Sequence, residues 1–172
     1  SAFQYLPDAM TELYQKEQAQ GKAPCSFATL ERVCLSKLRF LSREELRKIR
    51  GIQNGLENRI LEKVGKAASF DELETELVNR QYSRARIRRI LLSGYLNNTV
   101  ERSPFLPQYL RILGMNQRGT EILKRAKPSI PMESKMIRLV EKEYADALLE
   151  VRGTDQYSLA SPQIQPCGRE FT

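Results

Sequence analysis

The sequence of 172 residues contains no histidine and no tryptophan. Without histidine the chain offers no Ser–His or Cys–His nucleophile pair, no histidine general base and no histidine metal ligand. An adenylate-forming motif of the HxGH type is also excluded from these residues, because it needs two histidines. Since no other constellation of side chains has the spacing of a catalytic centre or a metal site, we predict neither.

Cysteine is scarce, and the three present are Cys25, Cys34 and Cys167. Their odd number and the lack of a CxxC spacing argue against a disulfide framework or a zinc site and favour a reducing compartment, so we expect a cytoplasmic location. Long apolar runs are missing too: none approaches the ~20 residues of a membrane span. The N-terminus does not have the layout of a signal peptide, and Ser1 and Ala2 have the form of a tag remnant. We therefore expect no membrane partner.

Acidic residues are outnumbered, with 21 Asp and Glu against 28 Lys and Arg, a net charge of +7. An excess of positive charge favours an acidic partner such as nucleic acid. The imbalance is sharpest between Glu76 and Glu101, where no acidic residue occurs. Five arginines fall in that stretch: Arg80, Arg84, Arg86, Arg88 and Arg89.

Most of the chain has the apolar periodicity and the start and stop signals of helices. A helix is expected from an Asp8 cap to Gln20, with Met10, Leu13 and Tyr14 buried and Gly21 as its stop. Ser42 with Glu45, and Ser69 with Glu72, have the spacing of capping boxes. The remaining helices are expected over 27–40, from Ser42 to an interruption at Gly51, and over 56–64, 69–80, 84–96, 116–127 and 133–150.

Two stretches lack helical periodicity. Residues 109–113 have β character and fit either an extended segment or a single helical turn, of which we favour the extended form. Residues 153–172 have the composition of an irregular tail that packs on the domain or trails from it. The length suits one domain. We therefore predict a mainly α fold: a compact multi-helix single domain, residues 1–172, with one short extended segment and an irregular C-terminal tail.

The stretch YSRARIRRILL, residues 82–92, raises a question about charge. Ser83 is a good N-cap, and Ile87, Ile90 and Leu91 lie on one helical face, but the first turn carries arginines. A helix N-terminus bears roughly +0.5 of a charge, so acidic residues are expected there. Either an anion such as RNA phosphate lies against this surface, or the arginines pair inside the fold with the acidic residues of the preceding helix: Glu72, Glu74 and Glu76.

We take the five arginines between Glu76 and Glu101 as the predicted RNA-binding residues. Such contacts hold the phosphate backbone without reading its sequence. A secondary basic cluster follows later in the chain: Arg118, Lys124, Arg125 and Lys127.

Four of these stretches, in this order and spacing, resemble the C-terminal part of the bacterial tRNA(Met) cytidine acetate ligase family. They are GLENRI (55–60), YSRARIRRILL (82–92), LRILGMNQRG (110–119) and TDQYSL (154–159), and the likeness extends from about Tyr5 to the end. In that family a nucleotidyltransferase-like N-terminal domain with an HxGH-type motif binds ATP and makes acetyl-adenylate from acetate. The acetyl group then passes to N4 of the wobble cytidine of elongator tRNA(Met).

The resemblance implies that the chain is the helical C-terminal domain of such a ligase, with the N-terminal catalytic domain absent. It implies no cofactor in this chain, and ATP with Mg for the other domain. The implied partners are tRNA, above all elongator tRNA(Met), and the catalytic domain of the same polypeptide. We expect a tRNA-binding module that is inactive by itself; the alternative is a structural or dimerisation module that braces the catalytic domain without touching RNA.

Overall fold

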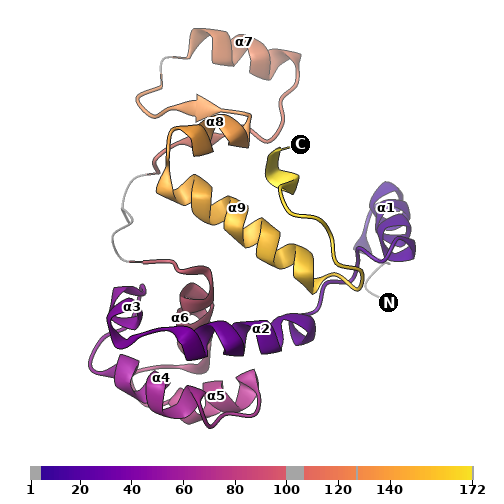
Figure 1. The fold of residues 1–172 in the computed structure, drawn as a ribbon. Helices are drawn as coiled ribbons and strands as arrows, with labels where there is room; N and C mark the ends of the chain where they lie inside the picture. Colours follow the sequence, from indigo (N-terminus) through magenta and orange to yellow (C-terminus); the bar gives the residue numbers. More distant parts are fainter. Residues whose placement is uncertain (1–4, 100–106, 127, 172) are drawn as a thin grey trace.

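A computed structural model describes residues 5–99, 107–126 and 128–171. These residues form mainly helices, together with one small sheet, as the sequence predicts (Figure 1). The α-helices are α1 (Asp8–Ala19), α2 (Phe27–Phe40), α3 (Arg43–Lys48), α4 (Leu56–Val64), α5 (Phe70–Leu77), α6 (Arg84–Leu96), α7 (Gln117–Arg125), α8 (Met136–Glu141) and α9 (Ala145–Tyr157). The strands are β1 (Leu110–Arg111) and β2 (Met132–Glu133), and short 3₁₀ helices follow as η2 (Ser158–Ala160) and η3 (Arg169–Phe171).

Polar N-caps fix where several helices begin. Ser42 and Glu45 make the predicted capping box, with each side chain accepting a hydrogen bond from the other residue's backbone N–H. Ser69 caps α5 as predicted, although the Glu72 carboxylate accepts from the N–H of Ala68 instead of Ser69. The Asp8 cap is wrong: α1 begins at Asp8 after Pro7, and no side chain caps it.

The main hydrophobic core lies between α2, α4, α5 and α6. Gly94 lets α6 pack closely against α2, because a Cβ at this position would lie 3.0 Å from Cδ2 of Leu38 on α2. Burial of a large apolar side chain contributes about 1.5–3 kcal/mol. The largest fully buried apolar side chains of this core are Phe70, Leu38, Leu46, Leu56, Ile60, Leu73, Leu77, Ile87 and Leu91.

A second, smaller cluster joins α8 and α9 around Met136, Leu139 and Ala147. Beside it β1 pairs in parallel with β2, which confirms the extended form of the stretch 109–113. The predicted helix over 133–150 is wrong. It is divided into α8 and α9 at Glu143, whose φ of 56° cannot continue a right-handed helix.

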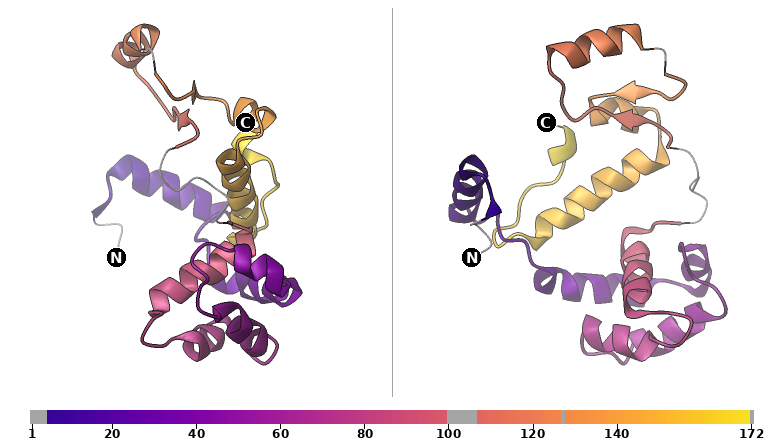
Figure 2. Two further views of the ribbon diagram at one scale, coloured as in Figure 1. Left: turned by 90° about the vertical axis from the view of Figure 1, so that its left-hand side faces the viewer. Right: turned by 180° about the vertical axis from the view of Figure 1, so that it is seen from behind.

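The chain beyond α9 returns along that helix (Figure 2). The predicted tail starts too early, since residues 153–157 still belong to α9. Asp155 then accepts a 2.7 Å hydrogen bond from the N–H of Gly168, and the Thr154 hydroxyl donates to Glu170 at 2.6 Å. These contacts hold the tail on the molecule. Ser1, Ala2 and Thr172 lie outside the described residues, and the single-domain assignment stays a prediction.

Helix α1 projects from the rest as an arm (Figures 1 and 2). We expected Met10, Leu13 and Tyr14 to be buried, which is wrong for the first two: Met10 is 51% and Leu13 50% exposed, while Tyr14 is half-buried. The amphipathic pattern was present, but the described residues supply little for that face to pack against. None of the described helices combines the length and the apolar character needed to cross a membrane.

Candidate nucleic-acid interface

Helix α6 begins where the sequence predicts. The Ser83 hydroxyl accepts from the N–H of Arg86, and no acidic residue lies in the first turn. The face carrying Ile87, Ile90 and Leu91 is buried in the main core. The opposite face therefore presents its arginines outward, and the structure shows what each one contacts.

Two of the five arginines have an acidic partner inside the fold. The side chain of Glu74 on α5 is fully buried, and its carboxylate accepts from Arg84 Nε at 3.2 Å. It also accepts from Arg88 at two points, Nε at 2.5 Å and Nη2 at 2.8 Å. Arg84 contacts Asp71 as well. The internal-pairing alternative is therefore correct for Arg84 and Arg88, and these hydrogen bonds raise the pKa of Arg88 further above its ordinary value.

The other two acidic residues named as partners are engaged elsewhere. Glu72 closes the start of α5, and Glu76 forms an ion pair with Lys63 at 3.0 Å. Glu74 alone of the three meets the arginine helix. The side chains of Arg84 and Arg88 are still 52% and 54% exposed, so each guanidinium keeps N–H groups that face solvent.

The Arg86 guanidinium packs over an aromatic ring instead of pairing with a carboxylate. Its guanidinium carbon lies 4.6 Å from the centroid of Tyr82, and Nη1 donates to the carbonyl of Gln81 at 3.4 Å. Tyr82 is itself buried and donates its hydroxyl to the carbonyl of Gln53 at 2.7 Å. A cation over a fixed aromatic face is oriented without losing its charge.

Arg80 and Arg89 are exposed, and neither forms an ion pair with any carboxylate in the part of the chain that the structure describes. Arg89 lies between two surface hollows. One is shared with Arg84 and Arg88, and the other with Arg86 and Arg50. The uncompensated positive charge of this surface thus comes from Arg80, Arg86 and Arg89, together with Arg50 from the loop after α3.

Sequence reasoning missed Arg50, because it lies far from the arginine helix along the chain and no local pattern marks it. It also missed two arginines that close helix ends. Arg39 donates to the carbonyls of Val64 and Ala67 where α4 ends, and Arg59 donates to the carbonyls of Glu76 and Leu77 where α5 ends. A basic side chain at a helix C-terminus satisfies free carbonyls and complements the dipole.

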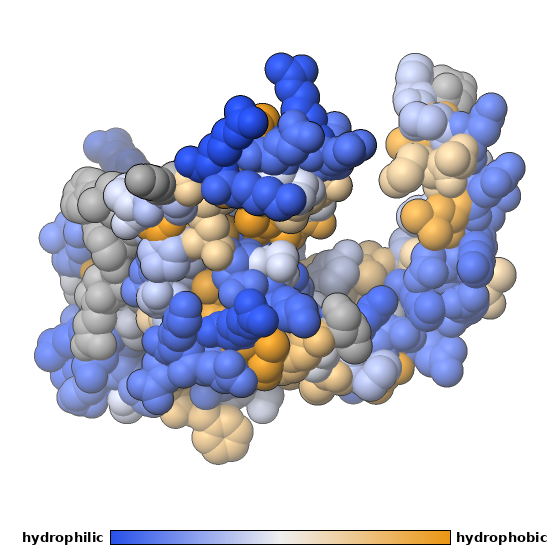
Figure 3. Space-filling model, turned by 90° about the horizontal axis from the view of Figure 1, so that it is seen from above, coloured by the Kyte–Doolittle hydropathy of each residue, from blue (hydrophilic) through white to orange (hydrophobic). Residues whose placement is uncertain are grey.

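The secondary basic cluster lies on α7, which buries none of its side chains. Arg118, Lys124 and Arg125 are exposed there, and Figure 3 shows hydrophilic side chains gathered over this helix. Lys127 lies outside the described residues. In Figure 1, α7 lies toward the opposite end of the molecule from α6.

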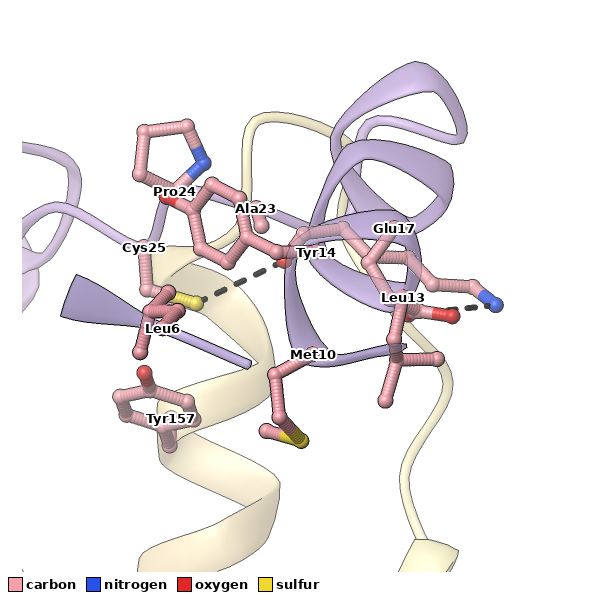
Figure 4. A pocket seen from close by; sticks show the side chains of 10 residues that line it. Leu6, Met10, Leu13, Tyr14, Glu17, Ala23, Pro24, Cys25 and Tyr157 are labelled. Atoms are coloured by element: carbon pink, nitrogen blue, oxygen red, sulfur yellow. Dashed lines mark hydrogen bonds and ion pairs between the residues drawn. The ribbon is translucent and has the colours of Figure 1, made fainter. Parts of the chain in front are cut away.

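An apolar hollow lies where α1 meets the end of α9. Its walls include Leu6, Met10 and Leu13 on one side and Cys25 and Tyr157 on the other (Figure 4).

Another cysteine, Cys34, lies in the main core. Burial raises the pKa of its thiol to about 11, so this thiol is unreactive. Within the described ranges no group of three or more His, Cys, Asp or Glu side chains is placed to hold a metal ion.

Comparison with known proteins places these features in a family. The family model described as HIGH Nucleotidyl Transferase matches residues 1–170. The chain belongs to the HIGH nucleotidyl transferase family. The tRNA(Met) cytidine acetate ligases of Syntrophomonas wolfei and Acetivibrio thermocellus are 34% and 29% identical to it, each across 97% of this chain. The chain covers 44% and 43% of those relatives, less than half of their length.

Solved structures agree with the sequence relatives. Thermotoga maritima TmcAL in its apo form superposes with a TM-score of 0.83 at 27% identity, over 97% of this chain and 44% of that one. The same protein bound with alpha-thio ATP gives a TM-score of 0.80. The chain is thus homologous to the tRNA(Met) cytidine acetate ligases.

The family match corrects one expectation. We expected a helical C-terminal domain distinct from the nucleotidyltransferase part, but the nucleotidyl transferase family model itself matches residues 1–170. The chain therefore belongs to the nucleotidyl transferase region of the family and is not a separate C-terminal domain. The expectation rested on the four stretches that resemble the C-terminal part of the ligase family, and the absence of histidine was taken as independent support for it. The HxGH motif is indeed not among these 172 residues, but a family model can match residues that do not carry the motif.

Proposed function

We propose that the chain binds tRNA through the arginine face of α6, as part of a ligase that forms N4-acetylcytidine at the wobble position of elongator tRNA(Met) from ATP and acetate. One observation carries the tRNA contact. On an acid-free segment, Arg80 and Arg89 are exposed and Arg86 is half-buried over Tyr82, and none of the three has a carboxylate partner among the described residues. Phosphates would offset the unfavourable placement of positive charge at a helix start.

The five predicted arginines then divide into two groups. Arg80, Arg86 and Arg89 supply net charge to the RNA backbone. Arg84 and Arg88 are neutralised by Glu74 and Asp71, and their solvent-facing N–H groups add hydrogen bonds but little attraction. The Thermotoga relative bound with alpha-thio ATP supports the ATP requirement of the ligase. A tRNA substrate also supports the expected cytoplasmic location.

Binding of an elongator tRNA(Met) transcript at several KCl concentrations tests the proposal. The triple variant Arg80→Ala/Arg86→Ala/Arg89→Ala should lower the slope of log K against log salt by about 2 to 3, which is 0.7–1 for each phosphate contact. The matched control, Arg118→Ala/Lys124→Ala/Arg125→Ala, removes the same charge from α7. Equal losses in both variants would contradict the proposal, because α6 would then contribute no more to tRNA binding than α7 does.

The second candidate is a structural or dimerisation role without RNA contact. The pairing of Arg84 and Arg88 with buried Glu74 favours it, since it shows arginines of α6 working inside the fold. A structural module would bind tRNA weakly and without steep salt dependence. The same titration of the unaltered chain therefore distinguishes the two candidates.

A further inference from the structure

A surface hollow of about 390 Å³ lies between α6 and the loop after α3. Its lining residues are Arg50, Gly51, Arg86, Arg89, Ile90 and Ser93. Three of the six carry a guanidinium, one carries a hydroxyl and none carries a carboxylate. Small-ligand clefts have volumes of roughly 300–1,000 Å³, so there is room for more than a single water-sized ion.

The backbone ties Arg50 to the segment that follows α6. Its N–H donates to the carbonyl of Asn98 at 3.2 Å, and the preceding Ile49 forms a bridge with Thr99. Gly51 follows with a φ of +94°, and a Cβ there would lie 3.1 Å from Cγ1 of Ile90. Only glycine suits both the angle and the contact, so the position of Arg50 beside α6 is built into the fold.

The Arg50 side chain, in contrast, is uncommitted. It is exposed and forms no ion pair within the described ranges. Across the hollow, Arg86 is oriented by the Tyr82 ring, and Arg89 has no carboxylate partner. Ser93 lies one helical turn beyond Arg89 on the same face. Three like charges held together are mutually repulsive, and an anion between them relieves that repulsion.

We propose that this hollow seats one backbone phosphate of an RNA strand, with Arg50 as a phosphate ligand from outside the arginine helix. The proposal rests on the proposed tRNA-binding function of α6. Guanidinium groups match phosphate oxygens two at a time, and a hydroxyl completes the set of donors. Arg50 fixes the register of the strand along α6, because its backbone cannot shift.

The test compares the unaltered chain with Arg50→Ala, Arg50→Lys and the control Lys48→Ala, by titration with a tRNA transcript at several KCl concentrations. Lys48 is exposed, carries the same charge two residues away and does not line the hollow. Arg50→Ala should raise Kd about tenfold, as expected for one lost charge-assisted hydrogen bond, and lower the salt slope by about 0.7–1. Arg50→Lys should restore the salt dependence of tRNA binding but not the full affinity. Lys48→Ala should change neither the affinity nor its salt dependence.

Each alternative outcome is distinct. If the unaltered chain does not bind tRNA, the proposed function fails. If it binds but Arg50→Ala matches Lys48→Ala, only the phosphate seat is overturned. If Arg50→Ala abolishes thermal stabilisation by inorganic phosphate yet leaves tRNA binding intact, the hollow holds a free anion and the proposal is again wrong. Ser93→Asp, which places a carboxylate in the hollow, should also weaken tRNA binding, and this keeps the test decisive if Arg50→Ala fails to fold.

Discussion

Glu74 and Arg88 form a two-point ion pair between α5 and α6, with one carboxylate oxygen 2.5 Å from Nε and the other 2.8 Å from Nη2. Arg84 reaches the same carboxylate from the preceding turn of α6. The arginines at the start of this helix therefore do meet acidic charge, but it comes from the neighbouring helix. Two of the arginines that the sequence predicts as RNA-binding residues, Arg84 and Arg88, therefore connect α6 to α5.

Removing both arginines should destabilise the fold. We expect Arg84→Ala/Arg88→Ala to lower the free energy of unfolding by about 3 kcal/mol, because buried Glu74 loses its partners. This is the lower end of such costs, because the two guanidinium groups are half-exposed and their removal opens the Glu74 carboxylate to water. Urea denaturation measures the change. Arg89→Ala, which breaks no ion pair, should stay within about 0.5 kcal/mol, and similar losses in both variants would contradict the assignment.

Ile90→Ala should cost roughly 2–5 kcal/mol, because Ile90 is only 3% exposed and its removal leaves a cavity in the main core. The matched control is Ile122→Ala on α7, where the side chain is 60% exposed. Thermal melts of the two variants should differ clearly. A small effect at Ile90 would show that this face of α6 is not tightly packed.

Ser42→Ala should cost about 1 kcal/mol, since it removes the side-chain half of the α3 capping box. Ser36→Ala, an exposed serine inside α2, should be neutral or slightly stabilising because alanine favours a helix interior. Chemical denaturation of both variants checks this contrast. Equal shifts would mean that the box contributes nothing to stability.

Acid should weaken the fold partly through Glu57. A hydrogen bond from its own backbone N–H, followed by that of Arg47, holds the pKa of this carboxyl below its ordinary value. A lowered pKa in the folded state stabilises the fold above the unfolded pKa, near 4.3, and this contribution disappears as the pH falls through the folded value. Between about pH 5 and pH 3 the unaltered chain should therefore lose more stability than Glu57→Gln. Parallel curves for the two proteins would show that Glu57 does not contribute.

The polypeptide of 172 residues should show no acetate-dependent consumption of ATP, because no histidine pair of the HxGH type is among its residues. An ADP- and AMP-detecting assay on the purified chain, with a full-length relative as positive control, measures this directly. Turnover above the blank would mean that other side chains of this chain perform the adenylation.

Local features could be predicted from the sequence, and non-local ones could not. The caps at Ser42, Ser69 and Ser83 could be predicted because each side chain forms its hydrogen bond within the first turn of its own helix. The break between α8 and α9 was not, since Glu143 adopts a positive φ without the glycine or proline that marks such a break.

The same distinction applies to the candidate site. The arginines of α6 were found from sequence, as charge along one helix can be counted. Which of them are neutralised depends on the packing of α5 against α6, and the contribution of Arg50 depends on a loop brought to α6 by the fold. Burial of α1 was predicted wrongly for the same reason, because amphipathicity does not say whether a partner is present.

The arginines that close α4 and α5 bear on how this surface can be dissected. Arg39 reaches two carbonyl oxygens with two different nitrogens, Nε and Nη2, a geometry that a lysine ammonium does not reproduce, whereas Arg59 reaches both of its carbonyls through Nη2 alone. Exchanging arginine for lysine conserves charge but removes the planar fork. A charge-conserving scan should therefore lower thermal stability most at Arg39 and leave it unchanged at exposed positions where only the positive charge matters. Such a scan distinguishes the arginines that stabilise the fold from those that are available to bind a polyanion. The net charge of +7 does not make this distinction, because it counts both groups alike.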